Sequence, residues 1–96
     1  MAVAVIQEFE GVTLDQYDEV LAQMGLTPAS AGPPGSLFHW VTATEDGILI
    51  TDVWETQEGF MAFAEESIRP SVAAIGIERE PAITFHEVHN HQTAGG

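Results

Sequence analysis

The spacing of apolar residues along the chain predicts four strands. The runs are short, rich in β-branched and aromatic side chains, and bounded by glycine, proline or acidic turn residues. They cover residues 3–9, 37–44, 48–55 and 82–89. The pair Asp46-Gly47 between the second and third runs is a strong hairpin signal, so we expect a type I′ turn at these two residues.

Two helices are predicted between the strands, because apolar residues recur there at helical spacing. Thr13 and Gln16 form a Thr-x-x-Gln capping box at the start of the first helix. Gly25 stands where a left-handed residue would end that helix. Thr56 is the expected cap of the second helix, and Pro70 is expected to interrupt and bend it.

The resulting order, βαββαβ, predicts a ferredoxin-like fold of the α+β class. Right-handed crossovers place both helices on one face of an antiparallel sheet. Residues 26–35 contain three prolines and two glycines, so we expect a loop between the first helix and the second strand. We expect a single domain over residues 1–90 and a flexible tail over residues 91–96, because the tail has nothing to bury.

The predicted hairpin has apolar residues on both of its faces. With a two-residue turn, Val41 opposes Asp52 and His39 opposes Trp54, all on the face toward the helices. The helices cover only this face, and a solvated sheet face normally carries charged residues. We therefore expect a second copy of the chain to cover the other face and form a homodimer through the β-sheet. That face carries Phe38, Trp40, Thr42, Thr44, Leu49, Thr51 and Val53.

The charge balance narrows the possible partners. The chain of 96 residues has 15 acidic residues against two basic ones, Arg69 and Arg79, and a formal net charge of −13. Such a chain repels phosphate backbones and anionic lipid, so we expect no nucleic-acid binding and no membrane binding. The chain has no cysteine, and its apolar start over residues 1–6 is too short for a span and lacks a basic flank. We expect a cytoplasmic location.

The third strand and the following helix resemble a known superfamily. The run Gly47-Ile-Leu-Ile-Thr-Asp-Val-Trp-Glu-Thr56, followed by Glu58-Gly-Phe60 and Phe63, resembles the strand-to-helix junction of dimeric α+β barrel proteins related to antibiotic-biosynthesis monooxygenases. The resemblance extends to residues 35–39, to Arg69-Pro70 with Gly76, and to residues 88–90, and looks like a branch found widely among actinobacteria. It covers nearly the whole chain in element order and implies a dimeric α+β barrel.

The resemblance does not fix a reaction. The superfamily includes cofactor-independent quinone-forming oxygenases, haem-degrading enzymes, polyketide cyclases, hydroxynitrile lyases and proteins with no known reaction. Haem-degrading relatives use an Asn on the first strand and a His late in the second helix, but residues 3–9 contain no Asn and residues 56–76 no His. The chain also lacks the glycine-rich phosphate loops and the Gly-x-Ser-x-Gly elbow. We expect no bound cofactor.

Three histidines near the end of the chain, His86, His89 and His91, invite a metal hypothesis. A metal site needs a third or fourth fixed ligand and ordered partners behind its ligands. This stretch runs into a tail that ends in glycine, so we expect no metal site.

His39 and Asp52 form the candidate catalytic pair. The expected register places them diagonally across the hairpin on the helix-facing side, about 7–8 Å apart. A carboxylate that orients an imidazole makes a usable general acid or base near neutral pH. In the alternative interpretation, Asp52 satisfies a backbone donor or caps a helix, while His39 packs on Trp54 and donates to the loop at residues 32–36.

Candidate ligand-binding residues surround this pair and come from both helices and the third strand. Tyr17 is the only tyrosine, and its hydroxyl either holds a ligand carbonyl or phenol or reaches the surface as the tip of a core side chain. The full set is Tyr17, Ile50, Trp54, Phe60 and Phe63.

Three functions are compatible with these residues. The first is a cofactor-independent monooxygenase or polyketide-cyclase-like enzyme for an aromatic or polyketide-like ligand, with His39 as base and Asp52 as its orienting partner. The second is a non-catalytic module that binds a small apolar or aromatic molecule. The third is a dimeric accessory protein whose space between helices and sheet is filled. An open cavity beside His39 would separate the first two from the third.

Overall fold

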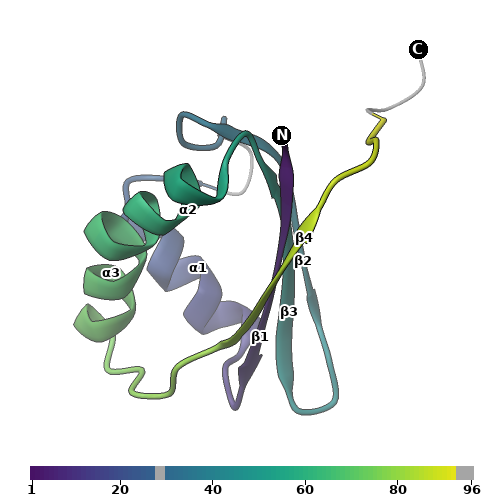
Figure 1. Cartoon of the computed structure of the whole chain (residues 1–96). Helices are drawn as coiled ribbons and strands as arrows, with labels where there is room; N and C mark the ends of the chain where they lie inside the picture. Colours follow the sequence, from purple (N-terminus) through teal and green to yellow (C-terminus); the bar gives the residue numbers. More distant parts are fainter. Residues whose placement is uncertain (28–29, 93–96) are drawn as a thin grey trace.

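Four antiparallel strands form one sheet in the computed structural model of the chain, which describes residues 1–27 and 30–92. The strands are β1 (Val3–Glu10), β2 (Ser36–Ala43), β3 (Gly47–Trp54) and β4 (Ala82–Glu87), in the spatial order β2-β3-β1-β4. Helix α1 (Leu14–Gln23) connects β1 to β2, and the helical run α2 (Gln57–Phe63), η1 (Ala64–Ile68) and α3 (Arg69–Ala74) connects β3 to β4. All helices lie against the same face of the sheet (Figure 1), so the ferredoxin-like α+β fold is confirmed.

The hairpin between β2 and β3 differs from the expectation in its turn. The prediction of a type I′ turn is wrong, because that turn needs a positive φ at both Asp46 and Gly47 and neither has one. The Thr44 N–H donates to the Gly47 carbonyl at 2.8 Å, and the Gly47 N–H donates to the Thr44 hydroxyl at 3.1 Å. Glu45 and Asp46 are therefore the central residues of the turn.

The register of the hairpin is shifted by two residues as a consequence. Ala43 pairs with Ile48 and Val41 pairs with Ile50, in place of the expected pairing of Val41 with Asp52. Because a shift of two residues returns each side chain to its original face, the predicted division of residues between the two faces still holds along β3 and most of β2.

Gly47 is required by its contact with β1. A Cβ at this position would lie 1.9 Å from the carbonyl oxygen of Phe9. The Gly11 N–H donates to the Asp46 carbonyl at 2.7 Å and ties the turn to the end of β1. The Asp-Gly pair is thus placed by tertiary packing, which explains why a local hairpin rule assigned it the wrong conformation.

The predicted caps of the helices are confirmed. The Thr13 hydroxyl accepts from the Gln16 N–H at 3.1 Å, and the Gln16 side chain accepts from the Thr13 N–H at 3.0 Å, which completes the capping box. Gly25 follows α1 with a φ of +77°. The Thr56 hydroxyl accepts from the Gly59 N–H at 3.0 Å at the start of α2.

The irregularity in the second helix begins before Pro70. The hydrogen bonding changes to the wider π pattern over Ala64–Ile68 and returns to the α pattern at Arg69. Pro70 lies in the first turn of α3, where a missing N–H is tolerated. Gly76, with a φ of +83°, follows the end of this run.

The core lies between the sheet and the helices and is built by the two central strands. Alternate residues of β1 and β3 point toward the helices and are buried. The buried apolar residues form two clusters, which are Val3, Val5 and Trp54 with Phe60 of α2, and Phe9, Ile48 and Ile50 with Val12, which lies just before α1.

The opposite face of the sheet, here called the outer face, has no helix against it (Figure 1). Its two most exposed aromatic side chains are Phe38 and Trp40, which are 44% and 43% exposed. The residues of the outer face, from the strand registers, are Ala4, Ile6, Glu8, Glu10, Phe38, Trp40, Thr42, Leu49, Thr51, Val53, Ala82, Thr84 and His86. The helix-free side of the sheet is therefore apolar and uncharged over β2 and β3, and it carries two carboxylates toward the end of β1.

The last strand is shorter than predicted and ends at Glu87. The Val88 N–H donates to the Ala2 carbonyl at 2.9 Å just beyond it. Of the predicted loop and tail, residues 28–29 and 93–96 lie outside the described residues. Within the described part of the chain, no helix combines the length and the apolar character needed to cross a bilayer.

Candidate functional site

His39 and Asp52 lie directly opposite each other on β2 and β3, because of the shifted register. The expected diagonal arrangement is wrong, and so is the expected pairing of His39 with Trp54, since Trp54 pairs with Ser36. The true register brings the two side chains into contact, and the His39 Nδ1 hydrogen bonds to Asp52 Oδ1. The Asp52 side chain is 7% exposed and the His39 side chain 40% exposed. A buried carboxylate therefore holds one nitrogen of a partly accessible imidazole.

Trp54 fixes the second oxygen of the Asp52 carboxylate. Its indole Nε1–H donates to Asp52 Oδ2 at 3.4 Å. The indole ring is itself held by Phe60 and Phe63, with ring centroids 5.7 and 5.5 Å away. A Cβ at Gly35 would lie 3.3 Å from the indole, so the loop before β2 closes tightly over it. Both oxygens of the carboxylate thus have a donor, and its orientation is set from two sides.

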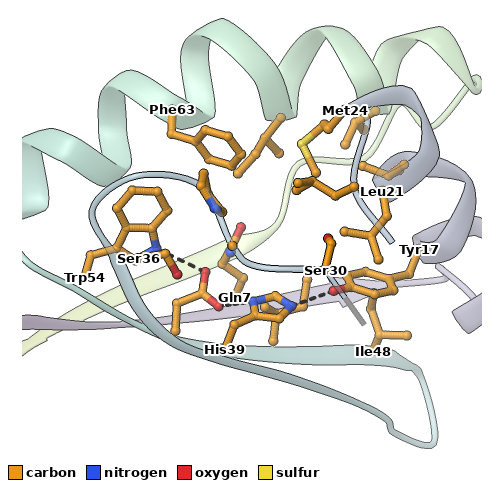
Figure 2. Close-up of a pocket in the computed structure, with 18 of the residues that line it drawn as sticks. Gln7, Tyr17, Leu21, Met24, Ser30, Ser36, His39, Ile48, Trp54 and Phe63 are labelled. Atoms are coloured by element: carbon orange, nitrogen blue, oxygen red, sulfur yellow. Dashed lines mark hydrogen bonds and ion pairs between the residues drawn. The ribbon is translucent and has the colours of Figure 1, made fainter. Parts of the chain in front are cut away.

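Tyr17 on α1 reaches the other nitrogen of the imidazole. Its hydroxyl lies 2.5 Å from His39 Nε2, and the two rings are stacked with 14° between their planes. If Asp52 accepts from Nδ1–H, the neutral imidazole has its acceptor at Nε2, so the Tyr17 hydroxyl donates there. Tyr17, His39, Asp52 and Trp54 form one continuous chain of hydrogen bonds, here called the polar network (Figure 2).

The Tyr17 hydroxyl is uncharged at neutral pH. Burial, followed by the charges of Asp52 and Asp18, raises the pKa of Tyr17 to about 12 from an ordinary value of 10.0. The phenol therefore remains a hydrogen-bond donor over the whole physiological range. Its position next to His39 is consistent with that role.

An open cavity of about 350 Å³ lies between the helices and the sheet, beside the polar network. This volume is in the range of small-molecule sites, and most of the wall is apolar. None of the described residues that line it is a lysine or an arginine. The lining includes Gln7, Phe9, Tyr17, Leu21, Met24, Ser36, His39, Ile48, Ile50, Asp52, Trp54, Phe63 and Val72.

The structure brings most of the predicted site residues to this cavity. Tyr17, Ile50, Trp54 and Phe63 line it together with His39 and Asp52. Phe60 is absent from the lining, because it is fully buried between the rings of Trp54 and Phe85. It supports the site from behind the indole.

Gln7 is a polar lining residue that the sequence interpretation missed. It is only 3% exposed and lies on β1 between the buried residues Val5 and Phe9. The strand alternation alone gave the signal, since a polar side chain in a row of buried apolar ones is unusual.

Comparisons with known proteins identify the fold. Neither protein families nor curated proteins give a match. Among solved structures, a dimeric ferredoxin-like protein of unknown function from Thermobifida fusca has a TM-score of 0.62 at 18% identity, covering 92% of each chain. A proposed antibiotic biosynthesis monooxygenase from Deinococcus radiodurans has a TM-score of 0.61 at 15% identity, covering 100% of each chain.

A third similar structure carries a ligand. It is a monooxygenase from Streptomyces coelicolor in complex with nanaomycin D, with a TM-score of 0.56 at 18% identity, covering 98% of this chain and 92% of that one. The fold is that of the antibiotic-biosynthesis-monooxygenase-like proteins. The resemblance in residues 47–63 predicted this fold correctly.

Proposed function

We propose that the chain is a homodimeric α+β barrel protein that binds a small apolar or aromatic molecule and oxygenates it without a cofactor. The observation that carries the proposal is the polar network beside an open, apolar cavity. Apolar packing alone would stabilise this layer, whereas a buried carboxylate with an imidazole and a phenol is a proton-transfer arrangement. The similar monooxygenase from Streptomyces coelicolor with bound nanaomycin D supports the choice of reaction class.

His39 is the proton acceptor in this proposal, and Tyr17 and Asp52 act on either side of it. Since the Tyr17 hydroxyl occupies Nε2, a substrate proton reaches the imidazole through Tyr17, which accepts it while giving its own proton to His39. No phenolate accumulates, in agreement with the raised pKa of Tyr17. Asp52 stabilises the imidazolium that forms and holds it in place.

The reaction balances without a bound redox group. Removal of a proton from a CH₂ that a conjugated carbonyl activates gives a carbanion, which reacts with O₂. One oxygen atom enters the product as a new carbonyl and the other leaves as water. The substrate gives up two hydrogens and supplies all four electrons, so the chain needs only a base in a dry cavity.

The homodimer is supported by the outer face. Phe38 and Trp40 are large, exposed and adjacent to other uncharged side chains on a helix-free sheet. The similar protein from Thermobifida fusca is a dimer. Two outer faces packed together would give the barrel that the sequence resemblance implies. We also propose a cytoplasmic location, in keeping with the absence of cysteine from the sequence.

The test is oxygen consumption with anthrone, a tricyclic ketone with one activated CH₂. The wild-type protein is expected to consume O₂ and form anthraquinone, whereas His39→Ala is expected to lose roughly a hundredfold or more of the rate while still binding anthrone. His89→Ala, which removes a histidine beyond β4, is the matched control and should keep the wild-type rate.

Three results would contradict the proposed reaction or the role of His39 in it. An equal rate in wild type and His39→Ala would remove His39 from the chemistry. Binding of anthrone without turnover by the wild type would assign a non-catalytic binding function. Cyclisation of a polyketide-like substrate without O₂ uptake would assign an aldol-type cyclase that uses the same base.

A further inference from the structure

Gln7 is a buried polar group that the proposed proton transfer does not use. It projects from β1 toward the helices in the same row as Val3, Val5 and Phe9 and is 3% exposed. In the part of the chain that the structure describes, no residue forms a hydrogen bond with its amide. Its side chain points into the cavity, in the same space as His39 and Tyr17 (Figure 2).

An amide in this position needs partners from outside the chain. Its oxygen accepts and its nitrogen donates, and burying either without a partner is unfavourable. Among the described residues, every fully buried side-chain polar atom has a hydrogen-bond partner. Because the Gln7 amide has none, its polar atoms are not fully buried and face the open cavity. A molecule in the cavity is what remains to pair with it.

We propose that Gln7 selects the ligand by forming hydrogen bonds with the ligand's polar edge. A ligand carbonyl accepts from the Gln7 Nε2–H, and an adjacent N–H or O–H of the ligand donates to Oε1. The complementary chemistry is a neutral ring compound with a carbonyl next to a donor, such as a lactam or a hydroxy-ketone. The inference rests on the proposed function only in using the same cavity.

The charges around the cavity favour a neutral ligand. Asp52 contributes a carboxylate to the wall, and no described lining residue is a lysine or an arginine. The chain as a whole carries a formal charge of −13. A ligand carboxylate or phosphate would have no cation to pair with and would be repelled, whereas an uncharged amide-like edge loses little on entry.

The strand register separates Gln7 from His39 by a distance that fits a fused ring system. Gln7 pairs with Ile50, and Ile50 pairs with Val41, two residues along β2 from His39. With strands about 4.8 Å apart, the backbone positions of Gln7 and His39 are roughly 12 Å apart, and less separates the side-chain ends. A two- or three-ring molecule can touch both.

The test compares two probes of the same bicyclic shape by protein-observed NMR titration. Hydrocarbostyril has a lactam fused to a benzene ring, and tetralin is the corresponding hydrocarbon. Gln7→Met keeps the side-chain length and removes the hydrogen bonds. We expect it to weaken hydrocarbostyril binding by about tenfold or more and to leave tetralin binding unchanged or tighter. Met24→Leu, another change in the lining, should affect both probes alike.

The stability of Gln7→Met supplies a second readout. A side chain that binds the ligand contributes nothing to folding. The melting temperature of Gln7→Met should therefore equal or exceed that of the wild type. A fall in melting temperature would make Gln7 a structural residue and overturn the inference.

The binding results separate this inference from the function of the site. If Gln7→Met weakens the binding of both probes equally, or of neither, the assignment of Gln7 is wrong while the cavity remains a binding site. If the wild type binds neither probe up to its solubility limit, the inference and the proposed ligand binding both fall. Loss of turnover in His39→Ala concerns the proposed reaction alone.

Discussion

The polar network depends on the order in which its four side chains contact one another. Trp54 and His39 occupy the two oxygens of Asp52, and Tyr17 closes the chain at the far nitrogen of the imidazole. Each group limits the freedom of the next, so the imidazole is held in one tautomer and one orientation. At this scale the chemistry depends on neighbours more than on any single residue.

Tyr17 gives a direct pH test of this arrangement. It is the only tyrosine, so the tyrosinate absorbance band reports it alone. With its pKa raised to about 12 by burial and by Asp52 and Asp18, the band should develop near that pH in the folded protein. An ultraviolet titration with a midpoint near 10.0, the ordinary value, would contradict the burial of the phenol beside Asp52.

The same shift in the pKa of Tyr17 predicts how stability depends on pH. The unfolded chain loses the phenolic proton near pH 10.0 and the folded chain near 12, so in between the folded state binds more protons. Stability from this group is complete below pH 10.0 and falls as the pH rises toward 12. Tyr17→Phe should remove that slope in denaturant titrations, while Phe38→Leu should retain it.

At the scale of elements, helix α1 positions Tyr17, and the capping box of this helix sets where α1 begins. Thr13→Ala removes the hydroxyl that accepts from the Gln16 N–H, and a lost N-cap costs about 1 kcal/mol. We expect a lower midpoint in thermal and denaturant unfolding with an unchanged fold.

A substitution at the other end of α1 is the control for this cap. Gln23→Ala changes an exposed side chain in the last turn and should leave the midpoint within experimental error. Equal losses in the two variants would contradict a specific contribution of the cap to the stability of α1.

Elements defined by local signals were predicted correctly from the sequence, and elements defined by distant contacts were not. The caps at Thr13 and Thr56 depend on residues three positions away and could be read from spacing. The turn at Asp46-Gly47 could not, because the carbonyl of Phe9 on another strand determines its backbone. The π segment over Ala64–Ile68 has no local signature in the sequence.

The candidate site was predictable in part for the same reason. Strand alternation placed His39, Asp52 and Trp54 on one face in the expected register and in the actual one, because the two differ by an even number of residues, so their proximity was foreseeable. The contact of Tyr17 with His39 depends on how α1 crosses the sheet, which a sequence pattern does not specify. Gln7 was predictable from the alternation along β1, which places it in the same row as the buried residues Val5 and Phe9.

At the scale of the whole molecule, the proposed dimer depends on the outer face. Trp40→Glu places a charge among the apolar side chains of that face and should convert the proposed dimer to a monomer in sedimentation equilibrium at micromolar concentration. Met61→Glu is the matched control, since Met61 is 46% exposed on α2, on the opposite side of the sheet. A single-chain mass for the wild type would contradict the proposed dimer.

Strand β2 lies at one edge of the sheet and has β3 as its only neighbour in the described sheet. Its successive side chains alternate between the cavity, through His39, and the outer face, through Phe38 and Trp40. An edge strand frays more easily than a central one, and contact between two outer faces would restrain it. Dilution to single chains would then make β2 and the His39 imidazole more mobile before the rest of the fold changes. Specific activity would decrease as the protein concentration is lowered, while the helical and strand content stayed the same.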